Sequence, residues 1–420
     1  KLNDIFEVKI EKLTYGLEGL TRYGDNKFVI FIKNALPDEK LKIKIISINK
    51  HFARGEIIEI LKTSEYRIKP ICNIFNACGS CQAQYCNYDY LIKQKTLILK
   101  EIFQNIIFDI PEVVKSPIIK EYRHKIQYPC RQTKNSKRIL MGYFKNKTHD
   151  LTNIKYCPLQ PDIINQITQF IRDNYILSCY SEKTKKGLLK NVLYRISTNN
   201  EILITFVIND NKINNEFKLF IEKLKNEFLN IKGIFVNFNQ NNTNKILSDN
   251  IKKIYGKDYI IEKLNDKQFK ISANSFFQVN PKCAIELFNI VKENIKENST
   301  ILDAYGGVGA IGIYVSDKAS KITLVEENLE ATKLAKENFE LNKIKNYEIY
   351  KGDAKKHFLN FKKENKLFDY IILDPPRSGC DREGLEAIIN LSKNIIYVSC
   401  NPQTLKRDCE FLISQGFSPQ

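Results

Sequence analysis

The sequence predicts an α/β fold: a doubly wound, Rossmann-like parallel sheet in the C-terminal part, preceded by a small β-barrel and an α+β segment. Three observations support this prediction. Residues 300–398 alternate between short apolar runs and helical segments, which is typical of a parallel sheet with helical crossovers. A glycine-rich turn follows the first of these apolar runs. Residues 1–62 contain short strand-like runs separated by turn residues, as in an all-β unit.

Composition bounds the size, partners and compartment of the protein. The chain has 420 residues, enough for two or three domains, and a net charge of +18. This charge favours a polyanionic partner such as RNA, because bound cations release counterions from phosphates; an inherited lysine-rich and asparagine-rich composition is the simpler alternative. The sequence has no apolar run of transmembrane length and no signal-peptide core. We therefore expect a cytoplasmic protein that binds no membrane. We also expect it to be a monomer.

Residues 1–62 form the first predicted domain. Apolar runs of strand length recur there between turn residues such as Gly24-Asp25-Asn26. Several short strands with turns favour a five-stranded barrel of the OB type, a common binder of single-stranded nucleic acid. A barrel that only caps its neighbour is the alternative. The predicted strands are residues 7–10, 27–32, 40–45 and 55–60.

Residues 63–90 and 111–270 form a predicted central α+β domain. Its basic side chains favour a phosphate-binding face, and a solvated charged face is the alternative. These side chains are Arg123, Lys125, Arg131 and Arg195. Strands are predicted at residues 126–130, 192–196, 202–208 and 232–237, and helices at residues 159–173 and 215–229. A further helix is predicted at residues 91–109, between the two parts of this domain.

Four of the eleven cysteines are spaced as metal ligands. Cys72, Cys78 and Cys81 share one short loop, and Cys157 follows much later. In a reducing compartment, clustered cysteines indicate metal binding more than disulfides. Four thiolates suit zinc or an iron–sulfur cluster, and the three-plus-one spacing is more typical of a [4Fe–4S] cluster. Buried structural cysteines are the alternative, and Cys86 lies close enough to compete as a ligand.

The glycine-rich turn at residues 304–312 matches a dinucleotide-binding fingerprint, but acidic residues at three strand ends favour S-adenosylmethionine over NAD. Asp303 lies directly before the turn, which disfavours a pyrophosphate and suits an ammonium group. Glu326 can accept both ribose hydroxyls, and Asp353 can accept the adenine amine. Gln278, in an extended segment before a helix that begins near Pro281, offers an amide to the polar end of such a cofactor.

Two further strand ends carry the groups needed to methylate uracil at C5. Asp374-Pro375-Pro376-Arg377 and Ser399-Cys400-Asn401-Pro402 each follow an apolar run. Uracil C5 is a poor nucleophile, and thiolate addition at C6 makes an enolate that is nucleophilic at C5. Cys400 offers the thiol, Asp374 a hydrogen-bonding carboxylate, and Arg377 a cation for the charge that develops on O4. A buried structural cysteine is the alternative for Cys400.

Two other classes of methyltransferase fit less well. RNA cytosine-5 enzymes place a cysteine directly after Asp-x-Pro, where this chain has Pro376 and Arg377 and only later Cys380. Amino-group methyltransferases carry Asn/Asp-Pro-Pro-aromatic and need no thiol. A non-catalytic RNA-binding or assembly protein that keeps the fold is the alternative from another class.

Taken together, the chain resembles the bacterial RNA uracil-5-methyltransferase family, in the branch that carries a TRAM domain and an iron–sulfur cluster. Gly16-Leu17-Glu18-Gly19, residues 34–39 and residues 53–67 resemble a TRAM domain. The other motifs behind the resemblance are the cysteine quartet, Phe277-Gln278-Val279-Asn280-Pro281, the DAYGGVG and DPPRSGCD segments, and SCNPQTLKRD.

The resemblance implies a fold, an activity and a set of site residues. It implies a class I methyltransferase domain of residues 91–110 and 271–420, and methylation of a uridine at C5, which we expect in 23S ribosomal RNA, with tRNA as the alternative. It implies Cys400 as the nucleophile. It implies a [4Fe–4S] cluster on Cys72, Cys78, Cys81 and Cys157, and a cofactor pocket lined by Gln278, Tyr305, Glu326, Asp374 and, as an addition, Asp353.

The C-terminal segment departs from the family pattern. Family members end with a strand pair carrying a glutamate that is taken to remove the C5 proton, and this chain stops at Gly416-Phe417-Ser418-Pro419-Gln420, before that position. We therefore expect residues 1–420 to bind cofactor and to trap RNA covalently, but to turn over slowly.

Overall fold

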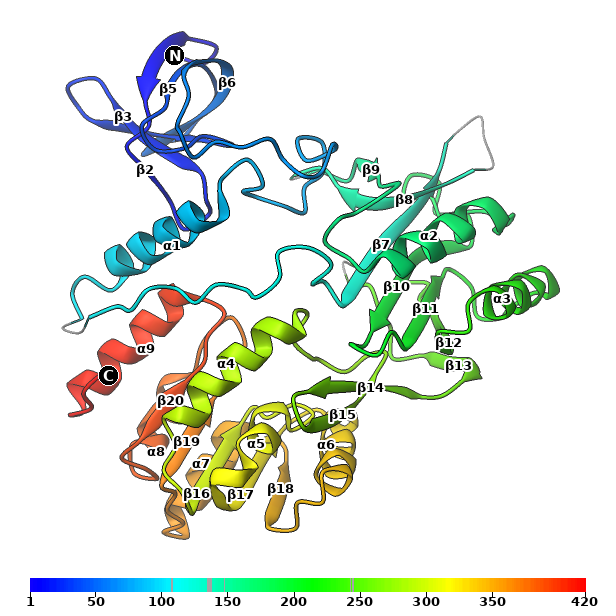
Figure 1. Ribbon diagram of the computed structural model, residues 1–420, viewed down its shortest axis with the longest axis vertical. Coiled ribbons are helices and arrows are strands. Elements are labelled where there is room, and N and C mark those ends of the chain that lie inside the picture. The colour runs from blue at the N-terminus through cyan, green and yellow to red at the C-terminus, as the bar shows by residue number, and fades with distance from the viewer. Residues whose placement is uncertain (107–108, 134–137, 147, 242, 244) are drawn as a thin grey trace. The chain divides into compact units, whose positions relative to one another are not determined.

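A computed structural model describes residues 1–106, 109–133, 138–146, 148–241, 243 and 245–420 (Figure 1). The chain divides into two compact units, Lys1–Lys115 with Phe144–Thr152, and Ser116–Tyr143 with Asn153–Gln420. The three-domain division expected from the sequence stays a prediction. None of the described helices is long and apolar enough to cross a membrane.

The first unit begins with a six-stranded sheet rather than the predicted five strands. Its order is β1-β5-β6-β4-β3-β2, and its core contains Val8, Ile30, Leu41 and Ile43. Buried and exposed residues alternate along β5, which explains why this strand could be predicted from the sequence. Strand β2 has only two residues, too few to show such an alternation. The strands are β1 (Ile5–Lys9), β2 (Lys12–Leu13), β3 (Gly19–Tyr23), β4 (Phe28–Ile32), β5 (Lys40–Ile48) and β6 (Phe52–Lys62).

Helix α1 (Tyr88–Ile102) also belongs to the first unit. It corresponds to the helix predicted for residues 91–109, of which residues 107 and 108 lie outside the described residues. The Asn87 side chain caps it by accepting from the Tyr90 backbone N–H at 3.1 Å. Leu91 and Ile98 on its buried face pack in one cluster with Leu13, Leu36, Phe75 and Tyr85.

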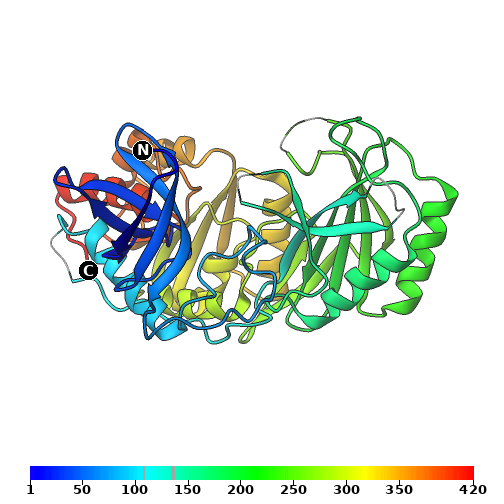
Figure 2. The ribbon, with the colours of Figure 1, turned by 90° about the horizontal axis from the view of Figure 1, so that it is seen from above.

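The second unit contains a mixed sheet in the order β13-β12-β11-β10-β7-β8, and β9 (Leu151–Asn153) lies where the chain passes between the units. Helices α2 and α3 cover one face of it (Figure 2). Phe206 of β11 packs against Phe217 of α3, and Tyr194 of β10 contacts Thr168 of α2. The elements are β7 (Lys125–Gln132), β8 (Ile139–Phe144), α2 (Asp162–Asn174), β10 (Leu189–Ile196), β11 (Ile202–Ile208), α3 (Asn215–Glu227), β12 (Ile231–Phe238) and β13 (Ile251–Gly256).

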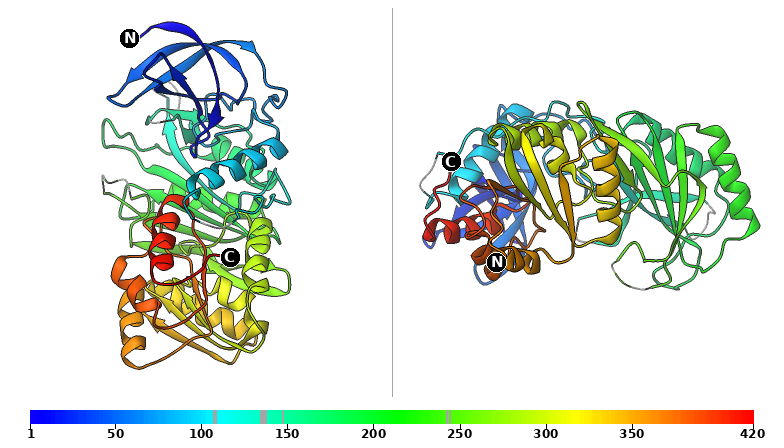
Figure 3. Two further views of the ribbon diagram at one scale, coloured as in Figure 1. Left: turned by 90° about the vertical axis from the view of Figure 1, so that its left-hand side faces the viewer. Right: turned by 90° about the horizontal axis from the view of Figure 1, so that it is seen from below.

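A five-stranded parallel sheet forms the C-terminal part of this unit, in the order β18-β17-β16-β19-β20. Alternate residues of β16 enter different cores: Ile301 packs with α4, α5 and α6, and Leu302 with α7, α8 and α9. Helices therefore cover both faces, as predicted for a doubly wound sheet; α4 and α8 lie on opposite sides in Figure 3.

The bounds of these C-terminal elements set where the site residues lie. A hairpin of β14 (Tyr259–Leu264) and β15 (Lys267–Ser272) precedes the sheet. The strands are β16 (Ser299–Ala304), β17 (Ala319–Glu326), β18 (Tyr347–Lys351), β19 (Tyr370–Leu373) and β20 (Ile395–Tyr397). The helices are α4 (Pro281–Glu293), α5 (Ala310–Tyr314), α6 (Leu329–Leu341), α7 (Ala354–Lys363), α8 (Arg382–Ile388) and α9 (Pro402–Ser414), with a short 3₁₀ turn at Ser316–Lys318.

Candidate active site

The five parallel strands end at one edge of the C-terminal sheet. Tyr305, Glu326, Asp374 and Cys400 lie at or just after the ends of β16, β17, β19 and β20. Strand order changes direction between β16 and β19, and this switch point is where ligands bind in open α/β sheets. The Asp374 N–H donates to the Ala304 carbonyl at 3.4 Å, which holds the ends of these two strands side by side.

The glycine-rich turn after β16 is fixed by the two acidic residues at neighbouring strand ends. Asp303 Oδ2 accepts from the Gly312 N–H at 2.9 Å, and Glu326 Oε2 accepts from the Gly307 N–H at 2.9 Å. Gly312 has no room for a side chain, because a Cβ there would come within 2.7 Å of Asp303 Oδ2. Tyr305 adopts a left-handed conformation with φ 62°, which turns the chain at the strand end.

Burial makes two carboxyls at this edge, those of Asp303 and Asp374, hard to ionise. It raises the pKa of Asp374 to about 6 and that of Asp303 to about 7, with Asp374 and Glu326 adding to the effect on Asp303. Asp303 is 1 % exposed, and within the described residues its Oδ1 atom has no hydrogen-bond partner. A ligand that brings positive charge and N–H donors would stabilise the ionised carboxylates, as S-adenosylmethionine does with its ammonium and sulfonium groups.

Gln278 and Asp353 lie at two different borders of this edge. Gln278 is half-buried in the segment between β15 and α4, whose backbone is fixed where the Val279 carbonyl accepts from the His124 N–H at 2.8 Å. Asp353 is exposed and caps α7 by accepting from the Lys356 N–H at 2.9 Å. Asp353 therefore caps a helix through Oδ1, and its Oδ2 atom is available to a ligand.

Cys400 and Cys380 are the two thiols near this edge, and burial separates them. Cys400 is exposed between β20 and α9. Cys380 is 4 % exposed, and its sulfur lies 3.9 Å from the Tyr305 hydroxyl and 3.7 Å from the Tyr397 hydroxyl. Burial raises the pKa of Cys380 to about 11, which disfavours the thiolate that a nucleophile needs. Only Cys400 of this pair is open to a substrate.

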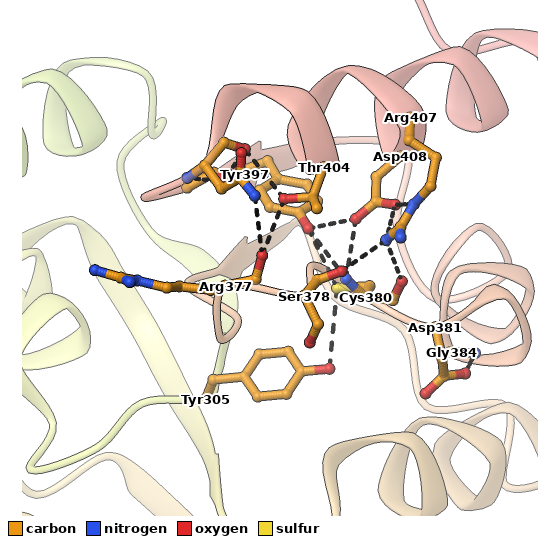
Figure 4. Close-up of polar contacts among 12 residues, drawn as sticks. Tyr305, Arg377, Ser378, Cys380, Asp381, Gly384, Tyr397, Thr404, Arg407 and Asp408 are labelled. Atoms are coloured by element: carbon orange, nitrogen blue, oxygen red, sulfur yellow. Dashed lines mark hydrogen bonds and ion pairs between the residues drawn. The ribbon is translucent and has the colours of Figure 1, made fainter. Parts of the chain in front are cut away.

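The loop that carries Arg377 is tied to the segment that follows Cys400. The Arg377 carbonyl accepts from Asn401 Nδ2 and from Thr404 Oγ1, each at 3.3 Å. The Arg377 side chain is exposed and extends away from these contacts (Figure 4). The backbone of the loop is therefore held while its guanidinium stays available to a substrate.

The four predicted metal ligands are divided between the two units, with Cys72, Cys78 and Cys81 in the first and Cys157 in the second. Cys72 and Cys81 contact opposite ends of the Gln84 amide, at 3.1 Å from the Cys72 N–H and 3.3 Å from Cys81 Sγ. Cys86, the possible competing ligand, is buried, and burial raises the pKa of its thiol to about 11. Within the described residues, no group of three or more His, Cys, Asp or Glu side chains could hold a metal ion. The predicted [4Fe–4S] cluster is not shown by the described residues.

Sequence reasoning missed three polar residues behind the predicted ones: Tyr397, Arg407 and Asp408. The last is 1 % exposed and accepts hydrogen bonds from both Tyr397 and the loop after β19 (Figure 4). One signal was present. Asp408 sits at helical spacing from Phe411 and Leu412, on the buried face of α9, where a carboxylate needs partners.

Two family models match this chain. The model described as tRNA (Uracil-5-)-methyltransferase matches residues 87–415, and that of the TRAM domain matches residues 1–58. Uncharacterized RNA methyltransferases are similar over nearly the full length. The one from Oceanobacillus iheyensis is 34% identical, covering 99% of this chain and 92% of that protein, and the one from Fusobacterium nucleatum is 34% identical, covering 99% and 91%.

A solved structure is similar over most of the chain. It is the crystal structure of the Pyrococcus abyssi tRNA (uracil-54, C5)-methyltransferase in complex with S-adenosyl-L-homocysteine. The TM-score is 0.76 at 26% sequence identity, and the match covers 96% of this chain and 93% of that one.

Proposed function

We propose how this chain, which belongs to the RNA uracil-5-methyltransferase family and uses S-adenosylmethionine, carries out its reaction. In this proposal it methylates C5 of a specific uridine through a covalent bond between Cys400 and uracil C6. The observation that carries the proposal is the exposed Cys400 thiol at the same sheet edge as Asp374 and the Arg377 loop. A thiol, a carboxylate and a cation are the groups that this route needs.

Each proposed role follows from the chemistry of uracil. Cys400 Sγ adds to C6, and the electron pair of the C5=C6 bond moves into an enolate that places negative charge on O4. Arg377 stabilises that charge, because a cation held near a developing anion lowers the barrier to its formation. Bound S-adenosylmethionine would supply the methyl group that C5 accepts. A base then removes the C5 proton, and elimination of the Cys400 thiolate restores the double bond.

The cofactor pocket is proposed on Gln278, Tyr305, Glu326, Asp353 and Asp374. The buried carboxyl of Asp303 and the half-buried carboxyl of Asp374 support a cationic ligand, and the carboxylate at the end of β17 has the position expected for a ribose contact. Glu326 already accepts two backbone N–H groups, from Gly307 and Asn328, so it is preorganised before any ligand binds.

We propose 23S ribosomal RNA as the substrate, on the basis of the sequence resemblance and the TRAM domain. Transfer RNA is the second candidate, since the structural neighbour from Pyrococcus abyssi acts on uracil 54 of tRNA. The test is incubation with total RNA and methyl-labelled S-adenosylmethionine, followed by mapping of the labelled nucleotide. Label at one uridine of 23S RNA supports the first candidate, label in tRNA the second, and label on no uridine in either contradicts the proposed function.

The raised pKa of Asp374 predicts a pH dependence of stability. Between the ordinary value of 3.8 and about 6, this carboxyl is protonated in the folded chain and ionised in the unfolded chain. The contribution of Asp374 to the free energy of unfolding should therefore fall as the pH rises through this window. Asp374→Asn should remove this contribution to the dependence of the free energy of unfolding on pH, and the contribution of Asp303 should remain. The measurement is urea unfolding of both proteins at several pH values. Identical slopes for the variant and the unchanged chain would refute the raised pKa.

The [4Fe–4S] cluster stays a prediction from the spacing of Cys72, Cys78, Cys81 and Cys157. Anaerobically purified protein should then be brown and contain about four iron and four sulfide ions per chain. Cys78→Ser should remove the colour, and Cys283→Ser, outside the quartet, should keep it. Colourless protein that contains zinc would support a zinc site in place of the cluster. Protein without any metal would show that the four cysteines are ordinary thiols.

A further inference from the structure

Hydrogen bonds connect three strand ends at the proposed catalytic edge (Figure 4). Tyr305 comes from the loop after β16, Cys380 from the loop after β19, and Tyr397 ends β20. The Tyr397 hydroxyl donates to Asp408 Oδ2 at 2.6 Å, so its single proton is used there. The Cys380 thiol lies between the two tyrosine hydroxyls, and the chain of contacts ends on Asp408.

The Asp408 carboxylate is the centre of this network. Besides Tyr397, it accepts from the Cys380 N–H at 2.9 Å through Oδ2 and from Arg407 Nε at 2.8 Å through Oδ1. The loop lies directly on it. Gly379 has φ +74°, and a Cβ at that position would come within 2.6 Å of Asp408 Oδ2.

Arg407 extends the network along the same loop. Its Nη2 atom donates to the carbonyls of Ser378 and Cys380, each at 3.0 Å. Together with the contacts of Asn401 and Thr404 to the Arg377 carbonyl, α9 holds three carbonyls and one N–H of residues 377–380. Cys400 lies just before α9, so the same helix fixes both the nucleophile and the loop that carries Arg377.

We propose that the Arg407–Asp408 pair positions Arg377 relative to Cys400, so that the guanidinium lies where the uracil O4 charge develops when the thiol adds. Both residues are positioning residues that touch neither substrate nor cofactor. This inference rests on the proposed function and deepens it.

The Arg407–Asp408 pair is better suited to positioning than to stability alone. Phe411 and Leu412 already anchor α9 in an apolar core, and an apolar residue in place of Asp408 would avoid the cost of burying a carboxylate. The charged pair also orients the backbone of the loop, because a forked guanidinium and a two-oxygen carboxylate hold several backbone groups at set distances. A displacement of about 1 Å in a catalytic group costs on the order of 100-fold in rate.

The test compares Arg407→Gln with Lys406→Gln on the same helix. The half-buried Lys406 pairs with the exposed Glu410 at 3.7 Å, and no hydrogen bond joins it to the described residues of the network, so its replacement removes the same charge elsewhere. Label transferred from S-adenosylmethionine is counted in free RNA and in RNA bound to protein, under single-turnover conditions. Arg407→Gln should slow transfer by about 10- to 100-fold, with dissociation constants for RNA and S-adenosylhomocysteine changed by less than about twofold. Lys406→Gln should transfer at the unchanged rate.

Tyr397→Phe and Asp408→Asn keep the proposal falsifiable if Arg407→Gln folds poorly. Each changes one polar group at nearly constant shape, and each should slow transfer without weakening either ligand. A lower melting temperature with an unchanged transfer rate in all folded variants would overturn the positioning role. The unchanged chain separates the two claims: if it labels no uridine, the proposed function fails, and if it does but Arg407→Gln labels equally fast, only the positioning role fails.

Discussion

Replacing Cys400 by alanine is expected to abolish methyl transfer, with a loss of roughly 1,000-fold or more, because removal of a covalent nucleophile leaves only the binding contributions to catalysis. RNA binding should survive, since the exposed thiol contributes little surface and the fold does not depend on it. The measurement is label transferred from S-adenosylmethionine to RNA, together with an RNA-binding isotherm.

Cys409→Ala is the matched control for that variant. Cys409 lies in the middle of α9, nine residues from Cys400 in sequence, and contributes no group to the proposed site. Its transfer rate should equal that of the unchanged chain. Full activity of Cys400→Ala would exclude the thiol route. Loss of RNA binding with loss of transfer would assign Cys400 to the fold instead. An unchanged chain that binds RNA and never transfers label would favour the non-catalytic RNA-binding alternative.

Replacing Arg377 by alanine is expected to slow transfer by about 100- to 1,000-fold, the usual effect of removing one group that stabilises a developing oxyanion. Stability should change little, because the structure uses the Arg377 carbonyl for its contacts and leaves the side chain exposed. Arg377→Lys should recover part of the rate, since it returns the charge without the fork.

Arg382→Gln provides a control for loss of an exposed arginine near the same loop. Arg382 pairs with Glu386 on α8 and contacts the ring of Phe411. The control should retain its transfer rate, and the affinities for S-adenosylhomocysteine and RNA should stay the same in all three variants. An Arg377→Ala variant with a normal rate and weakened RNA binding would reassign this arginine to phosphate contact.

The positions of most candidate site residues could be predicted because these residues directly follow apolar strands. Tyr370–Leu373 is wholly buried and stops at Asp374, and the strand that leads to Glu326 stops in the same way. Parallel strands that share a sheet bring these ends to one edge, so spacing in the sequence was enough to group them. The TRAM domain at the N-terminus and the doubly wound sheet were also correct predictions.

Elements with a mixed pattern were harder to predict. Strand β13 has no fully buried residue and carries two lysines, so its hydrophobic period is weak and its place at the edge of the sheet depends on pairing with β12. Helix α1 showed a buried face in its sequence, but nothing in that face tells which surface it covers. It packs with residues of the first unit.

The network around Asp408 lay beyond sequence reasoning for a topological reason. Its partners Cys380 and Tyr397 are 28 and 11 residues away along the chain, and only the pairing of β19 with β20 brings their loops together. Burial likewise distinguishes Cys380 from Cys400, although each follows a strand in the sequence. Tertiary packing decides which of two such residues is exposed, and the local sequence pattern does not.

The most direct test of the sulfur–carbon bond uses the target RNA with 5-fluorouridine at the methylated position. Fluorine at C5 cannot leave as a proton does, so the addition product should accumulate as a stable protein–RNA adduct once the methyl group has been accepted. Proteolysis and mass spectrometry should then find the modified nucleotide on the peptide that contains Cys400. An adduct on Cys380 or any other residue, or ready methylation of ordinary RNA by a protein that never forms an adduct, would contradict the mechanism.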